Sequence, residues 1–398
     1  MSCTQRVGFY KLLPWKAREH SADGESNAVT TTKRILCIVG TRPEAIKMAP
    51  VILGLQREVW ADVKVIATAQ HRQMLDQTLA IFGIVPDCDL DLMRPNQALA
   101  ALTARALESL DARFVEDAPD LVLAQGDTTT VLAAAMAAFY RRIPFGHVEA
   151  GLRTFDLDNP FPEEFNRIVA GRVTRLHFAP TESARRNLLN EKVDPATVLV
   201  TGNTVIDALL HVTARNPEPP MALDPERRLI LVTVHRRENF GEPLAGICDA
   251  IEAIVEGDPT VEVLWPVHPN PNVSGVVRAR FATHPRIRLV DPLDYLGFAA
   301  SMNRAFLVLT DSGGVQEEAP ALAKPVLVLR STTERPEAVD TGVARLIGTD
   351  TATIIDETRR LLNDEAHYRS MARGASPYGD GKATGRIVGA VRKFLCNR

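Results

Sequence analysis

The sequence ILCIVGTRPEAIK, residues 35–47, contains the pattern that decides the fold. A short apolar run at 35–39 is followed by a glycine turn and then by a segment with the composition of a helix. Repeats of such a unit are typical of parallel sheets covered by helices on both faces, because strands buried on both faces are almost wholly apolar. The chain predicts two series of these strands, at 35–39, 63–68, 121–124, 143–148, 176–179 and 197–201, and at 229–234, 261–267, 287–290, 306–310, 326–329 and 344–347.

A stretch rich in proline and glutamate, 211–227, separates the two series and predicts a loop, with a hinge near 203–225. A chain of 398 residues also exceeds what one hydrophobic core usually serves. The predicted fold class is α/β, with two Rossmann-like doubly wound domains facing across a cleft. The expected organisation is a disordered extension at 1–32, a first domain with catalytic acids at 33–205, a second domain at 206–380, and a C-terminal helix at 381–398 that packs back on the first domain.

The composition excludes several classes of protein. A formal net charge of −3 and a pI near 6.3 give no general attraction to nucleic acids or anionic membranes, so we expect neither as a partner. The longest apolar run, 131–140, is about half as long as a membrane-spanning helix, and 1–32 lacks the apolar segment of a secretory signal. The five cysteines are far apart and lack metal-ligand spacing, which favours reduced structural thiols, no metal and a cytoplasmic location.

Polar and charged residues follow the predicted strands of the first series. Gly40 precedes a predicted helix whose first backbone N–H groups can hold an anion, and Arg42 and Lys47 add positive charge there. A tight turn with two surface cations is the alternative, and the spacing is not that of a P-loop. Asp127, after the strand at 121–124, is either a helix N-cap or a catalytic acid.

Two more acids are expected at the same sheet edge. Glu149 comes directly after the strand at 143–148, and Glu163 and Arg167 lie four residues apart in the next predicted helix. An exposed ion pair between Glu163 and Arg167 is the simpler interpretation of that spacing. Three strand ends that each supply a carboxyl group favour an acid/base site instead.

The second series has polar strand ends of its own. His235 begins a His-Arg-Arg sequence that is too polar for a core. The Ser-Gly-Gly turn at 312–314 can bind a diphosphate through backbone N–H groups that no Cβ obstructs. Glu317 or Glu318, one turn further on, would then accept hydrogen bonds from ribose hydroxyls, and Arg335 adds a cation at the same edge.

Taken together, these segments resemble one family, the non-hydrolysing UDP-N-acetylglucosamine 2-epimerases of bacteria. The similarity extends from about Arg34 to Phe394. Two positions differ from the family pattern, Phe165 in place of a small residue and Pro269 in place of a leucine. The resemblance rests on the order and spacing of the motifs GTRPEAIKMAP, AQHRQMLDQ, QGDTTT, GHVEAGLRT, FPEEFNR, TGNTVID, HRRENFG, TDSGGVQEEAP, TTERPEAV and PYGDGKA.

The resemblance implies a glycosyltransferase-B type fold, UDP binding by the second domain, and roles for individual residues. The implied catalytic residues are Asp127, Glu149, Glu163 and His235. The implied substrate-binding residues are Arg42, Lys47, Arg167, Phe298, Ser312, Gly313, Gly314, Glu318 and Arg335. A second UDP-N-acetylglucosamine, bound as an allosteric activator, would contact Gln70, His71, Gln73, Arg94 and His268.

The implied reaction converts UDP-N-acetylglucosamine reversibly to UDP-N-acetylmannosamine, by anti elimination of UDP to 2-acetamidoglucal and re-addition of UDP. It uses no cofactor and no metal, and it would supply a precursor for cell-surface polysaccharide. The resemblance also implies a homodimer whose ligands are UDP-N-acetylglucosamine and UDP. The nearest alternative is a hydrolysing epimerase that releases N-acetylmannosamine and UDP, followed by a glycosyltransferase of the same fold and a non-catalytic sensor of UDP-sugars.

Overall fold

The computed structural model of the chain describes residues 32–68, 72–94, 97–374 and 376–396, with the backbone alone described at 72–74. Residues from Thr32 onward form one compact unit. The extension expected at 1–32 therefore lies outside the described residues, apart from Thr32. Within the described ranges, no helix is both long and apolar enough to cross a membrane.

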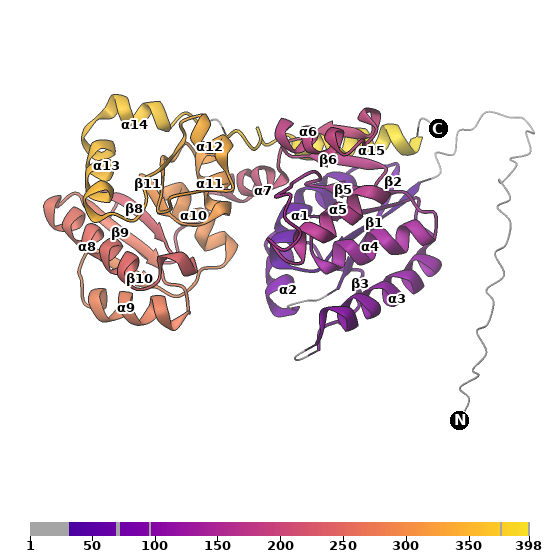
Figure 1. Cartoon of the computed structure of the whole chain (residues 1–398), viewed down its shortest axis with the longest axis horizontal. Helices are drawn as coiled ribbons and strands as arrows, with labels where there is room; N and C mark the ends of the chain where they lie inside the picture. Colours follow the sequence, from indigo (N-terminus) through magenta and orange to yellow (C-terminus); the bar gives the residue numbers. More distant parts are fainter. Residues whose placement is uncertain (1–31, 69–71, 95–96, 375, 397–398) are drawn as a thin grey trace, which may run out of the picture. The chain divides into compact units, whose positions relative to one another are not determined.

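The first series of strands forms a sheet of seven parallel strands (Figure 1). Their order is β3-β2-β1-β4-β5-β6-β7. Ile35 in β1 pairs with Val63 of β2 on one side and with Leu121 of β4 on the other, and every residue of β4 is buried. The bounds are β1 (Lys33–Val39), β2 (Ala61–Ala67), β3 (Cys88–Asp89), β4 (Leu121–Gln125), β5 (Phe145–Val148), β6 (Leu176–Ala179) and β7 (Val198–Val200).

The second series forms a sheet of six parallel strands in the order β10-β9-β8-β11-β12-β13. Its core contains the fully buried Trp265 and Phe281, and it lies between helices on both sheet faces (Figure 1). The predicted α/β class with two doubly wound sheets is confirmed. The bounds are β8 (Arg228–Thr233), β9 (Val261–Pro266), β10 (Ile287–Val290), β11 (Leu307–Thr310), β12 (Val326–Val328) and β13 (Ala344–Leu346).

Each sheet has one point at which the strand order reverses. The chain builds β1, β2 and β3 outward, then returns to add β4 on the free side of β1; the second sheet does the same at β8 and β11. Open α/β sheets bind ligands beside the carboxyl ends of the strands at such a point, because the connections there lead to opposite faces and leave a crevice. The loops after β1, β4, β8 and β11 are therefore the expected place for a site.

Several helices begin at a side chain that accepts a hydrogen bond from a backbone N–H of the first turn, as Thr41, Thr128 and Asp294 do. Such caps satisfy N–H groups that have no partner inside the helix. The α-helices are α1 (Arg42–Gln56), α2 (Arg72–Ile81), α3 (Leu99–Asp117), α4 (Thr129–Tyr140), α5 (Glu163–Val173), α6 (Glu182–Asn190), α7 (Thr204–Thr213), α8 (Glu242–Gly257), α9 (Pro271–Phe281), α10 (Tyr295–Arg304), α11 (Gly313–Glu318), α12 (Pro336–Asp340), α13 (Thr351–Asn363), α14 (Glu365–Met371) and α15 (Ala383–Cys396). Short 3₁₀ helices lie at Pro195–Thr197, Arg237–Asn239 and Ala319–Leu322.

The last helix, α15, contacts α1 and α7 and lies among the indigo and magenta elements of the first sheet (Figure 1). Asp207 of α7 accepts hydrogen bonds from the backbone N–H groups of Ala383 at 3.2 Å and Thr384 at 2.8 Å. Gly54 of α1 allows the helices to approach, because a Cβ at this position would lie 2.6 Å from Cγ2 of Thr384. The Asp207 hydrogen bonds and the contact between α1 and α15 thus hold the C-terminal helix against the helices of the first sheet.

Three details differ from the sequence-based expectations. The strand β3 was not predicted, because its two residues are too few to form an apolar run. The strand expected at 143–148 begins at Phe145, because Pro144 has no N–H to contribute to the sheet. The loop expected at 211–227 begins only after Thr213, because α7 continues to that residue and buries its apolar side.

Candidate active site

The loop after β1 is joined to the loop after β4 through Glu44. Thr41 is the N-cap of α1, and Glu44 accepts a hydrogen bond from the Thr41 N–H at 2.7 Å, which completes a capping box. The same carboxylate accepts from the N–H of Gly40 at 2.6 Å and from the hydroxyl of Thr128. Burial raises the pKa of Glu44 to about 7, although these hydrogen bonds favour its charged form. Arg42 in this turn reaches the pocket formed by the second sheet.

Asp127 lies in the loop after β4, at the reversal point of the first sheet. It is not the cap of α4, because Thr128 has that position, so the N-cap alternative is wrong. The Oδ2 atom of Asp127 is 3.3 Å from Nη2 of Arg167. Burial raises the pKa of Asp127 to about 6; Arg167 lowers it, whereas the charges of Glu149 and Glu163 raise it further. The three predicted acids are therefore close enough to influence one another.

Glu149 follows β5 directly and is buried, with a backbone φ of 64°. Residues other than glycine rarely adopt this left-handed backbone conformation, because it costs free energy. Where it occurs, it often marks a functional site. Its carboxylate accepts hydrogen bonds from Lys47 at 2.6 Å, from Asn203 at 2.9 Å and from Gln125. Burial opposes the charge, but Lys47 and the hydrogen bonds lower the pKa of Glu149 overall. Glu149 is thus held charged, whereas the pKa of Asp127 is raised to about 6.

A buried chain of hydrogen-bonded side chains connects Glu149 with the second sheet. Asn203, the N-cap of α7, donates its two side-chain hydrogens to Glu149 and to Glu317 of α11, the latter at 3.0 Å. Glu317 in turn accepts a hydrogen bond from Nε of Arg335, and this carboxylate raises the pKa of Arg335 above its ordinary value. Lys47 and Arg335, both predicted to bind substrate, are therefore each paired with a carboxylate in this structure.

The helix α5 places Glu163 and Arg167 at the same site, but the two side chains do not form the predicted pair. The ion pairs of Arg167 are with Asp127 and, at 3.4 Å, with Glu164. Glu164 is fully buried and accepts hydrogen bonds from the N–H of Thr154 at 3.1 Å, so it holds the loop that leads into α5. Glu163 begins the helix and is half-buried. The interpretation of Glu163 and Arg167 as an exposed ion pair is therefore wrong.

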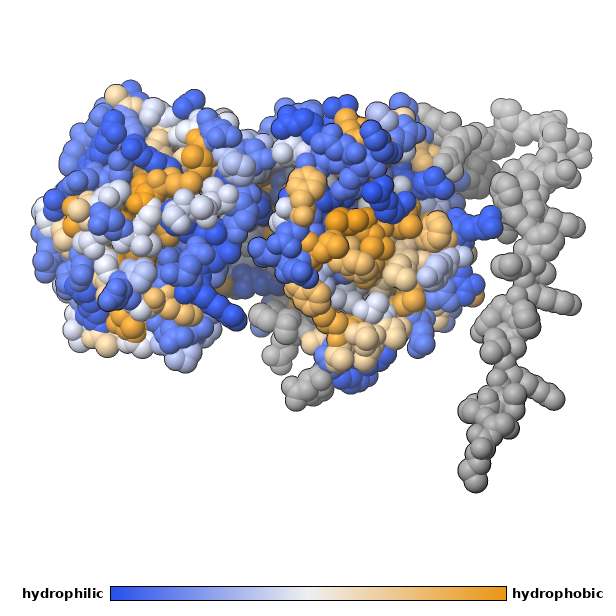
Figure 2. All heavy atoms as spheres, viewed as in Figure 1, coloured by the Kyte–Doolittle hydropathy of each residue, from blue (hydrophilic) through white to orange (hydrophobic). Residues whose placement is uncertain are grey.

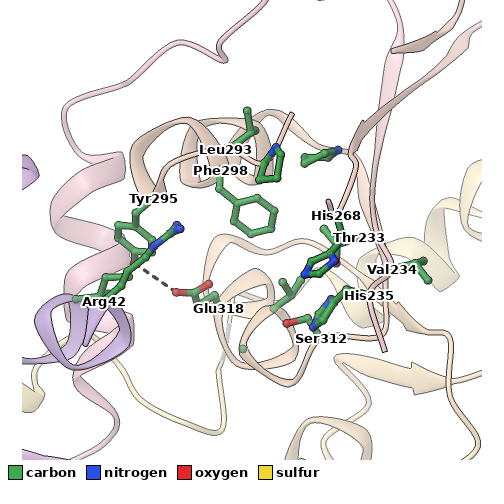
Figure 3. A pocket seen from close by; sticks show the side chains of 15 residues that line it. Arg42, Thr233, Val234, His235, His268, Leu293, Tyr295, Phe298, Ser312 and Glu318 are labelled. Carbon is green, nitrogen blue, oxygen red and sulfur yellow. Dashed lines mark hydrogen bonds between the residues drawn. The ribbon is translucent and has the colours of Figure 1, made fainter. Parts of the chain in front are cut away.

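At the reversal point of the second sheet, side chains line a cavity of about 290 Å³ (Figure 3). His235 forms part of its wall and is held by Asp311, the fully buried first residue after β11. The Nδ1 atom of His235 is 3.1 Å from Asp311, and the N–H groups of His235 and Arg236 donate to the same carboxylate. Burial opposes the charge of Asp311, but these hydrogen bonds lower its pKa overall. A buried carboxylate thus orients the histidine ring.

The Ser-Gly-Gly turn begins α11 beside this cavity, with Ser312 as the N-cap. A Cβ on Gly313 would come no closer than 3.9 Å to another side chain, and one on Gly314 no closer than 4.0 Å. Packing within the protein therefore does not require glycine at either position. The free space lies next to backbone N–H groups, which is the arrangement that a bound anion needs.

Glu318, Tyr295, Arg42 and Phe298 lie on the side of the cavity opposite the histidines (Figure 3). The hydroxyl of Tyr295 donates to Glu318 at 3.3 Å, and Arg42 extends toward this pair (Figure 3). Burial, with a further contribution from Glu317, raises the pKa of Glu318 to about 8. Glu318 is therefore mostly protonated at neutral pH in the free protein. The ring of Phe298 projects into the space between Glu318 and the histidines (Figure 3).

The residues predicted to bind an activator are only partly described. Gln70 and His71 lie outside the described residues, and Gln73 is in α2, where its backbone alone is described. Arg94 is exposed and donates to two backbone carbonyls of its own loop at 2.7 and 3.0 Å. His268 lines the cavity of Figure 3, where its ring stacks on the other histidine at a centroid distance of 5.8 Å. The activator site stays a prediction.

Glu44, Asp311 and Asn203 are among the site residues that were missed from the sequence. Glu44 could have been found, because a glutamate three residues after a threonine at a helix start is the signature of a capping box. Asp311 had a weaker signal as the first polar residue after an apolar strand. Asn203 had the signal of an N-cap, but its contacts with Glu149 and Glu317 depend on the folded chain.

Two further features bear on the chemistry. Cys37, Cys88, Cys248 and Cys396 are free, and Cys3 lies outside the described residues. In the part of the chain that the structure describes, no group of three or more histidine, cysteine, aspartate or glutamate side chains could hold a metal ion.

Comparison with known proteins identifies the family. A family model described as UDP-N-acetylglucosamine 2-epimerase matches residues 54–392. Proteins named UDP-N-acetylglucosamine 2-epimerase from Salmonella typhimurium and Escherichia coli K12 are each 50% identical, over 371 and 369 residues; these cover 91% and 90% of this chain and 99% and 98% of those proteins.

Solved structures agree with the sequence relatives. The UDP-GlcNAc 2-epimerase of Neisseria meningitidis, crystallised with UDP-GlcNAc, is 44% identical with a TM-score of 0.80, covering 90% of this chain and 100% of that one. The UDP-GlcNAc 2-epimerase of Methanocaldococcus jannaschii is 31% identical with a TM-score of 0.78, covering 90% and 99%. The chain that places acids at one sheet and an open glycine turn at the other therefore belongs to the UDP-N-acetylglucosamine 2-epimerase family.

Proposed function

We propose that this protein is a non-hydrolysing UDP-N-acetylglucosamine 2-epimerase, which interconverts UDP-N-acetylglucosamine and UDP-N-acetylmannosamine. One observation carries the proposal: neighbouring strand ends supply two carboxyl groups whose pKa values are shifted in opposite directions, upward for Asp127 and downward for Glu149. Inversion at C2 needs one group to take a proton from one face and another to return a proton to the other face. Two acids with different proton affinities suit that task.

The proposed reaction is an elimination followed by an addition. A carboxylate takes the proton from C2, the C1–O bond to UDP breaks, and the electron pair of the C–H bond forms the C1–C2 double bond of 2-acetamidoglucal. An oxygen of UDP then attacks C1 while C2 receives a proton on its other face. No water is consumed and no net redox change occurs, so atoms and electrons balance within the UDP-sugar and the protein carboxyl groups.

In this proposal the first sheet supplies the proton-transfer groups, Asp127, Glu149 and Glu163, with Arg167 placed beside Asp127. An incoming diphosphate would compete with Glu149 for the ammonium group of Lys47. Loss of that partner would raise the pKa of Glu149 and make it a stronger base as the substrate binds.

The second sheet is proposed to hold UDP. The turn at 312–314 and the cations Arg42 and Arg335 would stabilise the charge that develops on the departing diphosphate. Phe298 would contact the uracil and Glu318 would bind the ribose hydroxyls. His235, protonated in the complex, would donate from Nε2 to the phosphates while its Nδ1 stays bonded to Asp311.

The test is to incubate the protein with UDP-N-acetylglucosamine and identify every product by NMR. We expect an equilibrium mixture of the two UDP-sugars, reached from either side. Release of N-acetylmannosamine with one equivalent of UDP would instead assign the hydrolysing reaction. Binding of UDP without any change in the sugar would assign a sensor.

The product keeps its bond to UDP in the proposed reaction, so it remains an activated donor. Its chemistry suits consumption by glycosyl transfer, and we propose that this transfer builds cell-surface polysaccharide.

We also propose that the protein forms a homodimer through an apolar face on α3, α4 and α5. Phe161, Phe165 and Leu99 are 66%, 50% and 44% exposed, and they line a groove of about 560 Å³ with Leu132. Figure 2 shows the apolar side chains gathered over α4 and α5. A second copy would bury this face, because exposed apolar surface of this kind marks interfaces.

Light scattering during size-exclusion chromatography tests the dimer. The changes Phe161→Ser and Phe165→Ser together should shift the parent dimer to a monomer. The matched control is Val59→Ser with Val85→Ser. These valines are 93% and 82% exposed and do not line the groove. A monomeric parent, or a double phenylalanine variant that stays dimeric, contradicts this interface.

A further inference from the structure

The loop that carries Asp127 is held by buried side chains from two neighbouring elements. Nε2 of His147, in β5, is 2.6 Å from the carbonyl oxygen of Gly126, and Nδ2 of Asn166, in α5, donates to the carbonyl of Asp127 at 2.9 Å. His147 and Asn166 are 1% and 2% exposed. A carbonyl only accepts, so the proton of the neutral imidazole must be on Nε2. Burial lowers the pKa of His147 to about 4, which keeps the ring neutral.

Glu44 holds the third residue of this loop and extends the contact to another loop. The hydroxyl of Thr128 accepts from the Val131 N–H as the cap of α4, and it donates its one proton to Glu44. The other oxygen of Glu44 accepts from the N–H groups of Gly40 and Thr41. Glu44 is 3% exposed, and its carboxylate therefore ties the loop after β4 to the loop after β1 from inside the protein.

Three consecutive residues, 126 to 128, are thus each bonded to a different buried side chain, from β5, α5 and α1. From this arrangement we propose that Glu44, with His147 and Asn166, positions the carboxyl group of Asp127 relative to the loop that presents Arg42. These side chains bond to the loop itself, so their effect on the reaction passes through Asp127.

The catalytic consequence of this inference rests on the proposed epimerase function. Misplacement of a reacting group by about 1 Å can lower a rate by about 10² without removing any group that takes part. Loss of the Glu44 bond should therefore lower the rate of proton transfer while the second sheet continues to bind UDP. A merely structural role would instead lower stability and UDP affinity together.

The experiment compares Glu44→Gln with the parent and with Glu116→Gln, a control at an exposed residue of α3. The amide oxygen of a glutamine can still accept from Gly40 and Thr41 and so keep the turn before Arg42, whereas its amide nitrogen only donates and cannot accept the proton of Thr128. We expect kcat to fall by about 10-fold to 100-fold in Glu44→Gln, with KM and the UDP dissociation constant within about twofold of the parent. Hydrogen exchange of the peptide 125–131 should also become faster, and the control should match the parent in all three measurements.

If Glu44→Gln does not fold, a second pair of variants tests the same hydrogen bond from the side of Thr128. Thr128→Ser keeps the hydroxyl and should retain the parent kcat, whereas Thr128→Val removes it and should lose kcat as Glu44→Gln does. Unchanged kcat and exchange in a folded Glu44→Gln, or equal losses of kcat and UDP affinity, overturn the proposal. An inactive parent protein would contradict the proposed function, and the exchange measurement would still decide whether Glu44 holds the loop.

Discussion

The two sheets of this protein have the same order of strands around their reversal points, but they present different chemistry there. At the first sheet, Asp127 and Glu149 are held by charged and polar partners such as Arg167 and Lys47. At the second sheet, an open glycine turn, aromatic rings and the buried Glu318 line a cavity, and the fully buried Asp311 holds His235. The same topology thus supports proton transfer on one side and nucleotide binding on the other.

This difference shows that the topology determines where a site lies, whereas the side chains determine its chemistry. The reversal of strand order decides where a ligand can approach the backbone. The chemistry is decided by which carboxyl groups are buried there more strongly than their partners compensate, as the upward pKa shifts of Asp127, Glu44 and Glu318 illustrate. If the two sheets are as separate in function as they are in chemistry, a substitution at one sheet should leave the task of the other unchanged.

The largest effect is expected from removing an acid of the first sheet. Asp127→Asn and Glu149→Gln should each lower kcat by about 10² or more, because each removes a group proposed to carry a proton. UDP affinity should fall by no more than about threefold in either variant, because neither carboxyl group is part of the proposed UDP site. In Glu149→Gln it should rise, because the diphosphate no longer competes with a carboxylate for Lys47. Steady-state kinetics and calorimetric titration with UDP measure the two quantities.

Glu182→Gln provides the control for the acid variants, at an exposed residue of α6. A variant of Asp127 or Glu149 with near-parent kcat would remove that residue from the proposed mechanism. A large loss of UDP affinity in either variant would show that the two sheets do not have separate tasks.

A smaller effect is expected from closing the glycine turn of the second sheet. In Gly313→Ala the new methyl group would meet no side chain of the protein within 3.9 Å, so the melting temperature should not fall. The methyl group would occupy the space expected for the diphosphate, and UDP affinity should drop by about tenfold or more, the equivalent of one charge-assisted hydrogen bond.

Gly389→Ala is the matched control, since a Cβ there also meets nothing within 4 Å but the residue is in α15, away from both reversal points. Calorimetric titration with UDP compares the three proteins. Equal UDP affinity in Gly313→Ala and the parent would contradict the proposed position of the diphosphate.

The smallest effect is a pH dependence of stability caused by Glu318. Its pKa is about 8 in the folded protein, whereas the ordinary pKa of a glutamate is 4.5, so between these values the folded state binds more protons than the unfolded state. Stability must then fall as the pH rises through this window, and the loss is complete above about pH 8. Glu318→Gln has no such group, so its melting temperature relative to the parent should rise by a few degrees from pH 5 to pH 8.

Thermal unfolding of both proteins without UDP measures this difference, and Glu116→Gln controls for the loss of one carboxyl group. A difference that is constant or that shrinks toward pH 8 would mean that Glu318 is charged in the free pocket. UDP affinity should also fall in Glu318→Gln if this residue binds the ribose.

Much of the fold could be predicted from the sequence because buried strands leave a local signal. The runs at 176–179 and 287–290 coincide with β6 and β10, since each run is mostly apolar. The ends of the runs at 143–148 and 229–234 also located Glu149 and His235, because the residues after a parallel strand are at the ligand-binding edge. The two-residue β3 gave no such signal.

The rest of the site depends on contacts between distant segments. Glu44 and Thr128 are 84 residues apart, and Asn203 and Glu317 are 114 apart, so no local pattern indicates that they meet. The shifted pKa values of Asp127 and Glu318 depend on burial, which likewise follows from the packed chain. Gln70 and His71 lie outside the described residues, and their role stays a prediction.

The central claim is that C2 is inverted through loss and return of a proton at the acids of the first sheet, with UDP held by the second. The most direct test is to run the reaction in D2O and follow C2 of both UDP-sugars by NMR. Removal of the C2 proton and its replacement from solvent-exchanged carboxyl groups predicts deuterium at C2 of every UDP-N-acetylmannosamine molecule formed. Product that retains its original proton at C2 would contradict the elimination mechanism.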